Sequence, residues 1–132
     1  MKRVMSSALT VVISFCLVAS FSLASVAKAG TIKIGAILAV TGGASFLGGP
    51  ESRTLKMMVE DINAKGGING NKIDLIIKDS GANPEKAISF TKQLIEEDKV
   101  FAIIGPSTSG ETMKIKNIVE EAKMILVSCA AA

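Results

Sequence analysis

Histidine, tryptophan and tyrosine are all missing from the 132 residues of the chain. Without histidine there is no imidazole to act as a general base, to bind a metal or to activate a serine nucleophile. Without tryptophan and tyrosine, few aromatic side chains are left on which nucleic-acid bases stack. We therefore expect neither an enzyme nor a nucleic-acid-binding protein, and neither a metal nor a cofactor.

Cysteine is scarce, and one of the two cysteines, Cys16, lies in a segment typical of a secretory signal peptide. This segment has a basic start, a short apolar core interrupted by serines, and the sequence AKA at 27–29, which fits the small-x-small cleavage rule. A retained membrane anchor is the alternative, but the core is short for a membrane span. We predict a signal peptide over residues 1–29, cut after Ala29, and no internal disulfide in the mature chain.

The excess of positive charge belongs to the same segment. The whole chain has 15 Lys and Arg against 12 Asp and Glu, a formal net charge of +3. Lys2, Arg3 and Lys28 make up the difference, so the mature chain has balanced charges. This balance is typical of an ordinary soluble surface, and no nucleic-acid partner is expected.

Short apolar runs alternate with amphipathic helical patterns after the signal segment. The predicted strands are 32–38, 72–78, 100–104 and 124–128, with helices between them that begin near 50, 84 and 110. This order predicts an α/β fold, a doubly wound, Rossmann-like parallel sheet with right-handed crossovers. The chain stops directly after the fourth strand, so we expect the sheet to be truncated there and the sequence to be the front of something longer.

Several residues are expected to mark the helices. Pro50 is predicted in the first turn of the first helix, and Asn83 as the N-cap of the second. Met58 on the first helix and Ala122 on the third are predicted to face the sheet, because they recur with other apolar residues at helical spacing.

The glycine-rich loop at 42–49 invites a nucleotide-binding interpretation. A P-loop needs Lys and then Ser or Thr after its last glycine, where this chain has Gly49-Pro50. The glycine spacing does not fit the GxGxxG fingerprint of dinucleotide-binding folds either. A nucleotide-binding enzyme stays a remote alternative, and the loop is instead expected to reach a ligand cleft, with Leu47 and Phe46 as apolar wall.

The stretch VFAIIGPSTSG at 100–110 is predicted to form a buried strand, a tight turn and the start of a helix. Ligands bind at the carboxyl ends of strands in open α/β sheets, and a helix start offers free N–H groups to an anion such as a carboxylate. Ser107, Thr108 and Ser109 lie at this point. The alternative for Ser109 is that it only caps the helix, accepting from an N–H near Thr112.

Three segments carry a family resemblance: IKIGAILAVTGG at 32–43, VEDINAKGGINGNKIDLIIKDSGANPEKA at 59–87 and VFAIIGPSTSGET at 100–112. The run DINAKGGING, with the later spacing D-x-x-x-N-P, is the most specific part. On these segments the chain resembles periplasmic solute-binding proteins of the branched-chain amino-acid (leucine/isoleucine/valine-binding) family. The resemblance implies the type I periplasmic binding protein fold, with residues 30–132 as the N-terminal part of the first of two lobes.

The resemblance also implies an amino-acid site between the lobes. It places six residues there: Leu47, Ser107, Thr108, Ser109, Ala130 and Ala132. Ser109 and nearby backbone N–H groups would hold the carboxylate, and the carbonyl of Ala130 the ammonium. Ala132 stands where the family often has a threonine that helps to hold the ligand.

By the same resemblance the protein is expected to be the periplasmic solute-binding component of an ABC importer. It would deliver a branched-chain or other hydrophobic amino acid to a membrane permease. A ligand-sensing receptor or regulator domain of the same fold is the alternative, because it shares every motif. The second lobe is expected to complete the site, so a first lobe alone should bind orders of magnitude more weakly.

Overall fold

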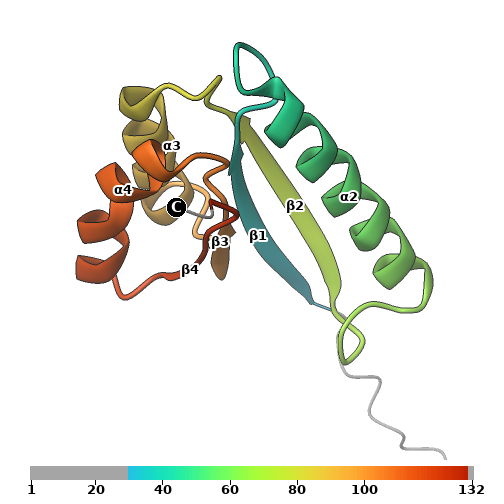
Figure 1. Cartoon of the computed structure of the whole chain (residues 1–132). Coiled ribbons are helices and arrows are strands. Elements are labelled where there is room, and N and C mark those ends of the chain that lie inside the picture. The colour runs from blue at the N-terminus through green and yellow to red at the C-terminus, as the bar shows by residue number, and fades with distance from the viewer. Residues whose placement is uncertain (1–29, 131–132) are drawn as a thin grey trace, which may run out of the picture.

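The computed structural model describes residues 30–130 (Figure 1). Its elements are β1 (Thr31–Leu38), α2 (Ser45–Ala64), β2 (Lys72–Asp79), α3 (Pro84–Glu96), β3 (Ala102–Ile104), α4 (Ser109–Glu121) and β4 (Ile125–Val127). The predicted alternation of strands and helices is confirmed. No helix in this range is both long enough and apolar enough to cross a membrane.

The four strands form one parallel sheet in the order β2-β1-β3-β4. β1 and β2 pair over eight residues, with Thr31 opposite Lys72 at one end and Leu38 opposite Asp79 at the other. β3 and β4 have only three residues each. Figure 1 shows α2 along one side of the β1–β2 pair, and α3 and α4 packed together on the other side. This is the predicted doubly wound arrangement, and it brings the carboxyl ends of all four strands to one edge, here called the carboxyl edge.

The core lies between the sheet and the α3–α4 pair. Ile37, Leu94, Ile103 and Ile115 are completely buried in it. Truncating one such side chain to alanine typically costs about 2–5 kcal/mol, so these contacts hold β1, β3 and both helices together. The core thereby sets the positions from which the loops of the carboxyl edge start.

α3 begins where the sequence predicts. The side chain of Asn83 accepts hydrogen bonds from the backbone N–H groups of Glu85 and Lys86, at 2.9 and 3.0 Å, and Pro84 follows at the first helical position. This N-cap satisfies two backbone donors that have no partner inside the helix.

α2 begins earlier than predicted. It starts at Ser45, so Pro50 lies inside the helix and not in its first turn. Gly48 explains the difference, because its backbone lies against the end of β1, and an added Cβ would be 2.3 Å from the carbonyl oxygen of Ala39. Only glycine allows the extra turn to form this close to the strand.

Two predictions of inward-facing residues are wrong. Met58 is 51% exposed, because α2 packs on β1 and β2 through a narrower stripe than the apolar pattern suggests. Ala122 is exposed because it is the C-cap residue of α4, beyond the turns that the sheet covers. Ile125 and Val127 on β4 are also more than half exposed, because β4 is the outer strand of the sheet formed by residues 30–130.

Candidate functional site

The strand order creates a topological switch point between β1 and β3. The chain leaves β1 toward β2, and leaves β3 in the opposite direction toward β4. The connections therefore diverge at the carboxyl edge, which is the usual ligand position in open α/β sheets. A hollow of about 370 Å³ lies at this edge, lined by Leu47, Glu51, Ser107, Thr108, Ser109, Cys129 and Ala130. We call it the edge hollow.

Five of the six residues predicted for the ligand site are brought together here. They are Leu47, Ser107, Thr108, Ser109 and Ala130. An adjoining hollow of about 190 Å³ shares Ser109 and Ala130 and adds Thr112 and Met113. The sixth residue, Ala132, lies outside the described residues, as does the predicted signal peptide. A common binding role requires that these five residues lie close together, as they do, but the role itself stays a prediction.

Thr108, not Ser109, is the N-cap of α4. The Thr108 side chain accepts from the backbone N–H of Glu111 at 3.4 Å and donates to Glu111 Oε2 at 2.6 Å. The hypothesis that Ser109 only caps the helix is therefore wrong. The spacing T-x-x-E at 108–111 is a capping-box signature, so this assignment was readable in the sequence.

Ser109 is left with its polar groups available. It is the first residue of α4, and its hydroxyl makes no hydrogen bond to another residue in the range 30–130. The first intrahelical bond of α4 runs from Thr112 N to the carbonyl of Thr108, at 3.0 Å, so the amides of Ser109 and Gly110 precede the helical ladder. One hydroxyl and two N–H groups thus lie in the first turn of the helix, where negative charge is favoured.

Ser107 differs from Ser109, because its hydroxyl is hydrogen-bonded to other residues of the protein. The side chain is only 4% exposed, and its Oγ accepts from the backbone N–H of Ala39 at 3.0 Å and donates to Glu51 Oε2. These bonds join the end of β1, the second turn of α2 and the loop after β3. Glu51 was missed by sequence reasoning, since nothing in the local sequence pairs position 51 with position 107.

Asp79 anchors the loop that leads to Leu47. Its carboxylate accepts from Thr41 N at 3.1 Å, Thr41 Oγ1 at 2.7 Å and Gly81 N at 3.0 Å. Partial burial raises the pKa of Asp79, but these hydrogen bonds outweigh it and hold the pKa below its usual value. The connections after β1 and β2 are therefore tied together at the carboxyl edge.

The end of β4 is tied to α4. Ala130 N donates to Ser128 Oγ at 3.1 Å, and Ser128 Oγ is hydrogen-bonded to Thr112 Oγ1 at 2.9 Å. The pKa of the free Cys129 thiol is raised, first by burial and then by the negative charge of Glu51. Across residues 30–130, no three His, Cys, Asp or Glu side chains gather as a metal site.

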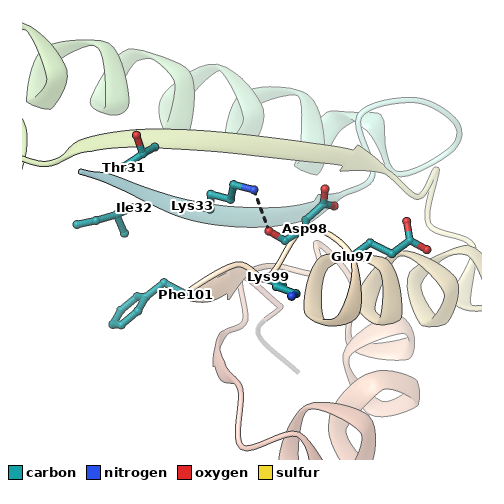
Figure 2. Close-up of a pocket in the computed structure, with 7 residues that line it drawn as sticks. All are labelled: Thr31, Ile32, Lys33, Glu97, Asp98, Lys99 and Phe101. Carbon is teal, nitrogen blue, oxygen red and sulfur yellow. Dashed lines mark hydrogen bonds between the residues drawn. The ribbon is translucent and has the colours of Figure 1, made fainter. Parts of the chain in front are cut away.

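A larger hollow of about 520 Å³ lies at the opposite edge of the sheet, at the amino ends of β1 and β3 (Figure 2). Lys33 in its wall donates to the backbone carbonyl of Asp98, at 3.2 Å, beside the C-terminal end of α3. Phe101 is 66% exposed and points away from that pair (Figure 2). The charged groups here meet protein partners or solvent, and none of the helices found in residues 30–130 begins at this hollow, so we assign the candidate site to the edge hollow.

Comparison with known proteins connects this geometry to a family. Residues 31–132 match the family described as periplasmic binding protein. The chain is 30% identical over 116 residues to the Leu/Ile/Val-binding protein of Escherichia coli K12. This alignment covers 88% of this chain and 31% of that protein.

Two solved structures are also similar. The branched-chain amino acid transporter substrate binding protein LivJ from Streptococcus pneumoniae, in complex with isoleucine, aligns with a TM-score of 0.74 at 35% identity, over 77% of this chain and 30% of that one. A solute binding protein of an ABC transporter from Rhodopseudomonas palustris BisB5, in complex with 3,4-dihydroxybenzoic acid, aligns with a TM-score of 0.70 at 26% identity. The alignment covers 76% of this chain and 28% of that one.

The chain spans about 31% of the length of the Escherichia coli relative, while the family match takes in all of the strands and helices described above. Family match, sequence identity and superposition agree with one another and with the observed strand order. The chain belongs to the periplasmic binding protein family and has its type I fold.

Proposed function

We propose that the chain contributes the first-lobe half of an amino-acid site in a solute-binding protein that serves an ABC importer. One observation carries the proposal: a helix start and the segment that follows a strand line the same hollow. Ser109, the first residue of α4, and Ala130, three residues after the end of β4, both line the edge hollow. A zwitterion needs donors at one end and acceptors at the other.

The carboxylate of the amino acid accepts hydrogen bonds from Ser109 Oγ and from the amides of Ser109 and Gly110, where the helix dipole favours its charge. The ammonium group donates to the carbonyl of Ala130. Leu47, which is 38% exposed, contacts the ligand side chain. Ala132 follows two residues after Ala130 and supplies no hydroxyl to the ammonium.

Ser107 and Thr108 support this site by fixing the backbone around Ser109. Their hydroxyls are bonded to Glu51 and Glu111, so they hold the loop and the helix start in place for Ser109. A site held by such bonds loses little conformational entropy when the ligand arrives.

Family membership supports the solute class and the compartment. The Escherichia coli relative is a Leu/Ile/Val-binding protein, and the Streptococcus pneumoniae structure holds isoleucine. We propose a hydrophobic amino acid as ligand, a periplasmic location after removal of residues 1–29, and delivery to a membrane permease. A second lobe closes over the edge hollow and buries the ligand.

Nitrogen-15 NMR of residues 30–132, titrated with L-leucine, tests the proposal. Saturable shifts are expected at the amides of Ser109, Gly110 and Ala130, but not at those of Lys33 and Phe101. The dissociation constant is expected in the millimolar range, because half of the site is missing. Micromolar or tighter binding would contradict the need for a second lobe.

A matched pair of variants assigns the site. Ser109→Ala is expected to weaken leucine binding at least several-fold, because it removes a hydrogen bond to a charged group. Ser89→Ala, at an exposed position on α3, should leave binding unchanged. No saturable shift at the carboxyl edge, or equal effects of the two substitutions, would contradict the proposed site.

A further inference from the structure

Glu51 places a carboxylate in the edge hollow that the proposed binding mode does not use. It lies in the second turn of α2, is partly buried, and lines the same hollow as Ser109 and Ala130. A negative charge beside a carboxylate-binding helix start is unfavourable unless something positive accompanies it. Its presence there therefore calls for a counter-charge.

The carboxylate of Glu51 is held in place with one oxygen to spare. Oε2 accepts from the Ser107 hydroxyl, which itself accepts from the backbone N–H of Ala39. Oε1 accepts no hydrogen bond from the described residues, and it is not among the polar atoms buried without a partner, which belong to Ser80 and Glu111. Since Glu51 lines the edge hollow, Oε1 is the oxygen that remains for a ligand there.

No cationic side chain of the described residues neutralises Glu51. The edge hollow has no Lys or Arg in its lining, and the ion pairs found within residues 30–130 are Lys65–Asp61 and Lys78–Asp98. The charge of Glu51 acts on Cys129, at the end of β4, where it helps to raise the pKa of the thiol. The field of this carboxylate thus reaches the side of the hollow where Ala130 lies.

We infer that Glu51 is a specificity-determining residue, whose carboxylate pairs with a positively charged nitrogen of the ligand and selects against carboxylic acids that lack one. This inference rests on the proposed function and deepens it, since it gives the ammonium a charged partner in the first lobe in addition to the carbonyl of Ala130. The selection is not imposed by the fold, because the Rhodopseudomonas palustris relative holds 3,4-dihydroxybenzoic acid, which has no amine.

Two ligands that differ at one group test the inference. L-leucine and L-2-hydroxy-4-methylpentanoate share a carboxylate and a side chain, but a hydroxyl replaces the ammonium in the second. Both are titrated into the chain and followed by the Ser109 and Gly110 amide shifts. Leucine is expected to bind about tenfold more tightly or better, the size typical of a hydrogen bond between charged groups.

Glu51→Gln is expected to abolish this preference by weakening leucine binding while leaving the hydroxy acid within about twofold. Glu60→Gln, an exposed position on the same helix, is the matched control and should keep the preference. A preference that survives in Glu51→Gln overturns the inference and leaves the proposed function standing. If neither ligand binds the unmodified chain, both the proposed function and the inference fall.

A second measurement avoids the substitution, in case Glu51→Gln does not fold. The carbon-13 shift of the Glu51 side-chain carboxyl is followed in the unmodified chain. It should move on saturation with leucine and stay in place with the hydroxy acid. Equal movement with both ligands, or no movement with leucine, overturns the inference.

Discussion

The two edges of the sheet differ in how their polar groups are used. At the carboxyl edge, the side chains of Asp79, Ser107 and Thr108 are hydrogen-bonded within the protein and hold loops and a helix start in place. Ser109 and one oxygen of Glu51 are thereby left to face a hollow of about 370 Å³. At the amino edge the hollow is larger, about 520 Å³, but Lys33 is bonded to a main-chain carbonyl. Free polar groups on anchored loops, and not volume, distinguish the proposed binding site from the depression at the amino edge.

The largest expected effect concerns the backbone of the carboxyl edge. Gly105 has φ +98°, and an added Cβ would lie 2.1 Å from the carbonyl oxygen of Ile37. Gly105→Ala should lower the free energy of unfolding by more than about 3 kcal/mol, or prevent folding. Gly110→Ala, where nothing lies within 4 Å of the added Cβ, should change it by less than about 1 kcal/mol. Urea unfolding measures both, and equal midpoints would contradict the close packing of the loop after β3.

The adjacent hydroxyls should separate stability from binding. Thr108→Ala removes the N-cap of α4 and leaves the buried Glu111 carboxylate without that donor, so it should cost about 1–3 kcal/mol in unfolding free energy. Ser109→Ala should change stability by less than about 0.5 kcal/mol while weakening leucine binding. Denaturant unfolding and NMR titration of both variants give the comparison. Equal losses of stability would show that Ser109 shares the capping role.

Asp79 should make the carboxyl edge sensitive to acid. The pKa of Asp79 is lower in the folded state than in the unfolded state. Its contribution to the free energy of unfolding is therefore complete above about pH 4 and is lost as the pH falls through the folded pKa. Asp79→Asn should cost about 1 kcal/mol at pH 7 and reduce the loss of stability below about pH 4. Asp74→Asn, exposed on the same strand, serves as the control, with no change expected at pH 7. An unaltered acid profile in Asp79→Asn would contradict the anchoring role.

The smallest effects are expected at the amino edge. Phe101→Ser and Lys33→Met change exposed side chains, so each should alter the unfolding free energy by less than about 1 kcal/mol. Neither should change the affinity for leucine in the NMR titration. A loss of leucine binding in either variant would show that the hollow at the amino edge takes part, and the contrast between the edges would fail.

The fold was predictable because local patterns and tertiary contacts agree over most of the chain. Apolar runs became strands, and Asn83-Pro84 began α3. The start of α2 was missed because it depends on Gly48 lying against Ala39, a contact between a strand end and a helix turn that periodicity does not encode. The extents of β3 and β4 also came out shorter than predicted, since pairing with neighbouring strands sets where a strand ends.

By itself, the sequence determines the order of the elements, the parallel sheet and the hydroxyl-rich turn at its carboxyl edge, because these follow from periodicity and from residue types that are close along the chain. The T-x-x-E spacing at 108–111 already marks Thr108 as the hydroxyl that caps the helix, but only the tertiary structure decides which hydroxyl holds the loop and which stays free. That division depends on Glu51 and Ala39 approaching Ser107 from positions more than 50 residues away. Contacts over such distances arise only when the sheet has formed and brought its strand ends together.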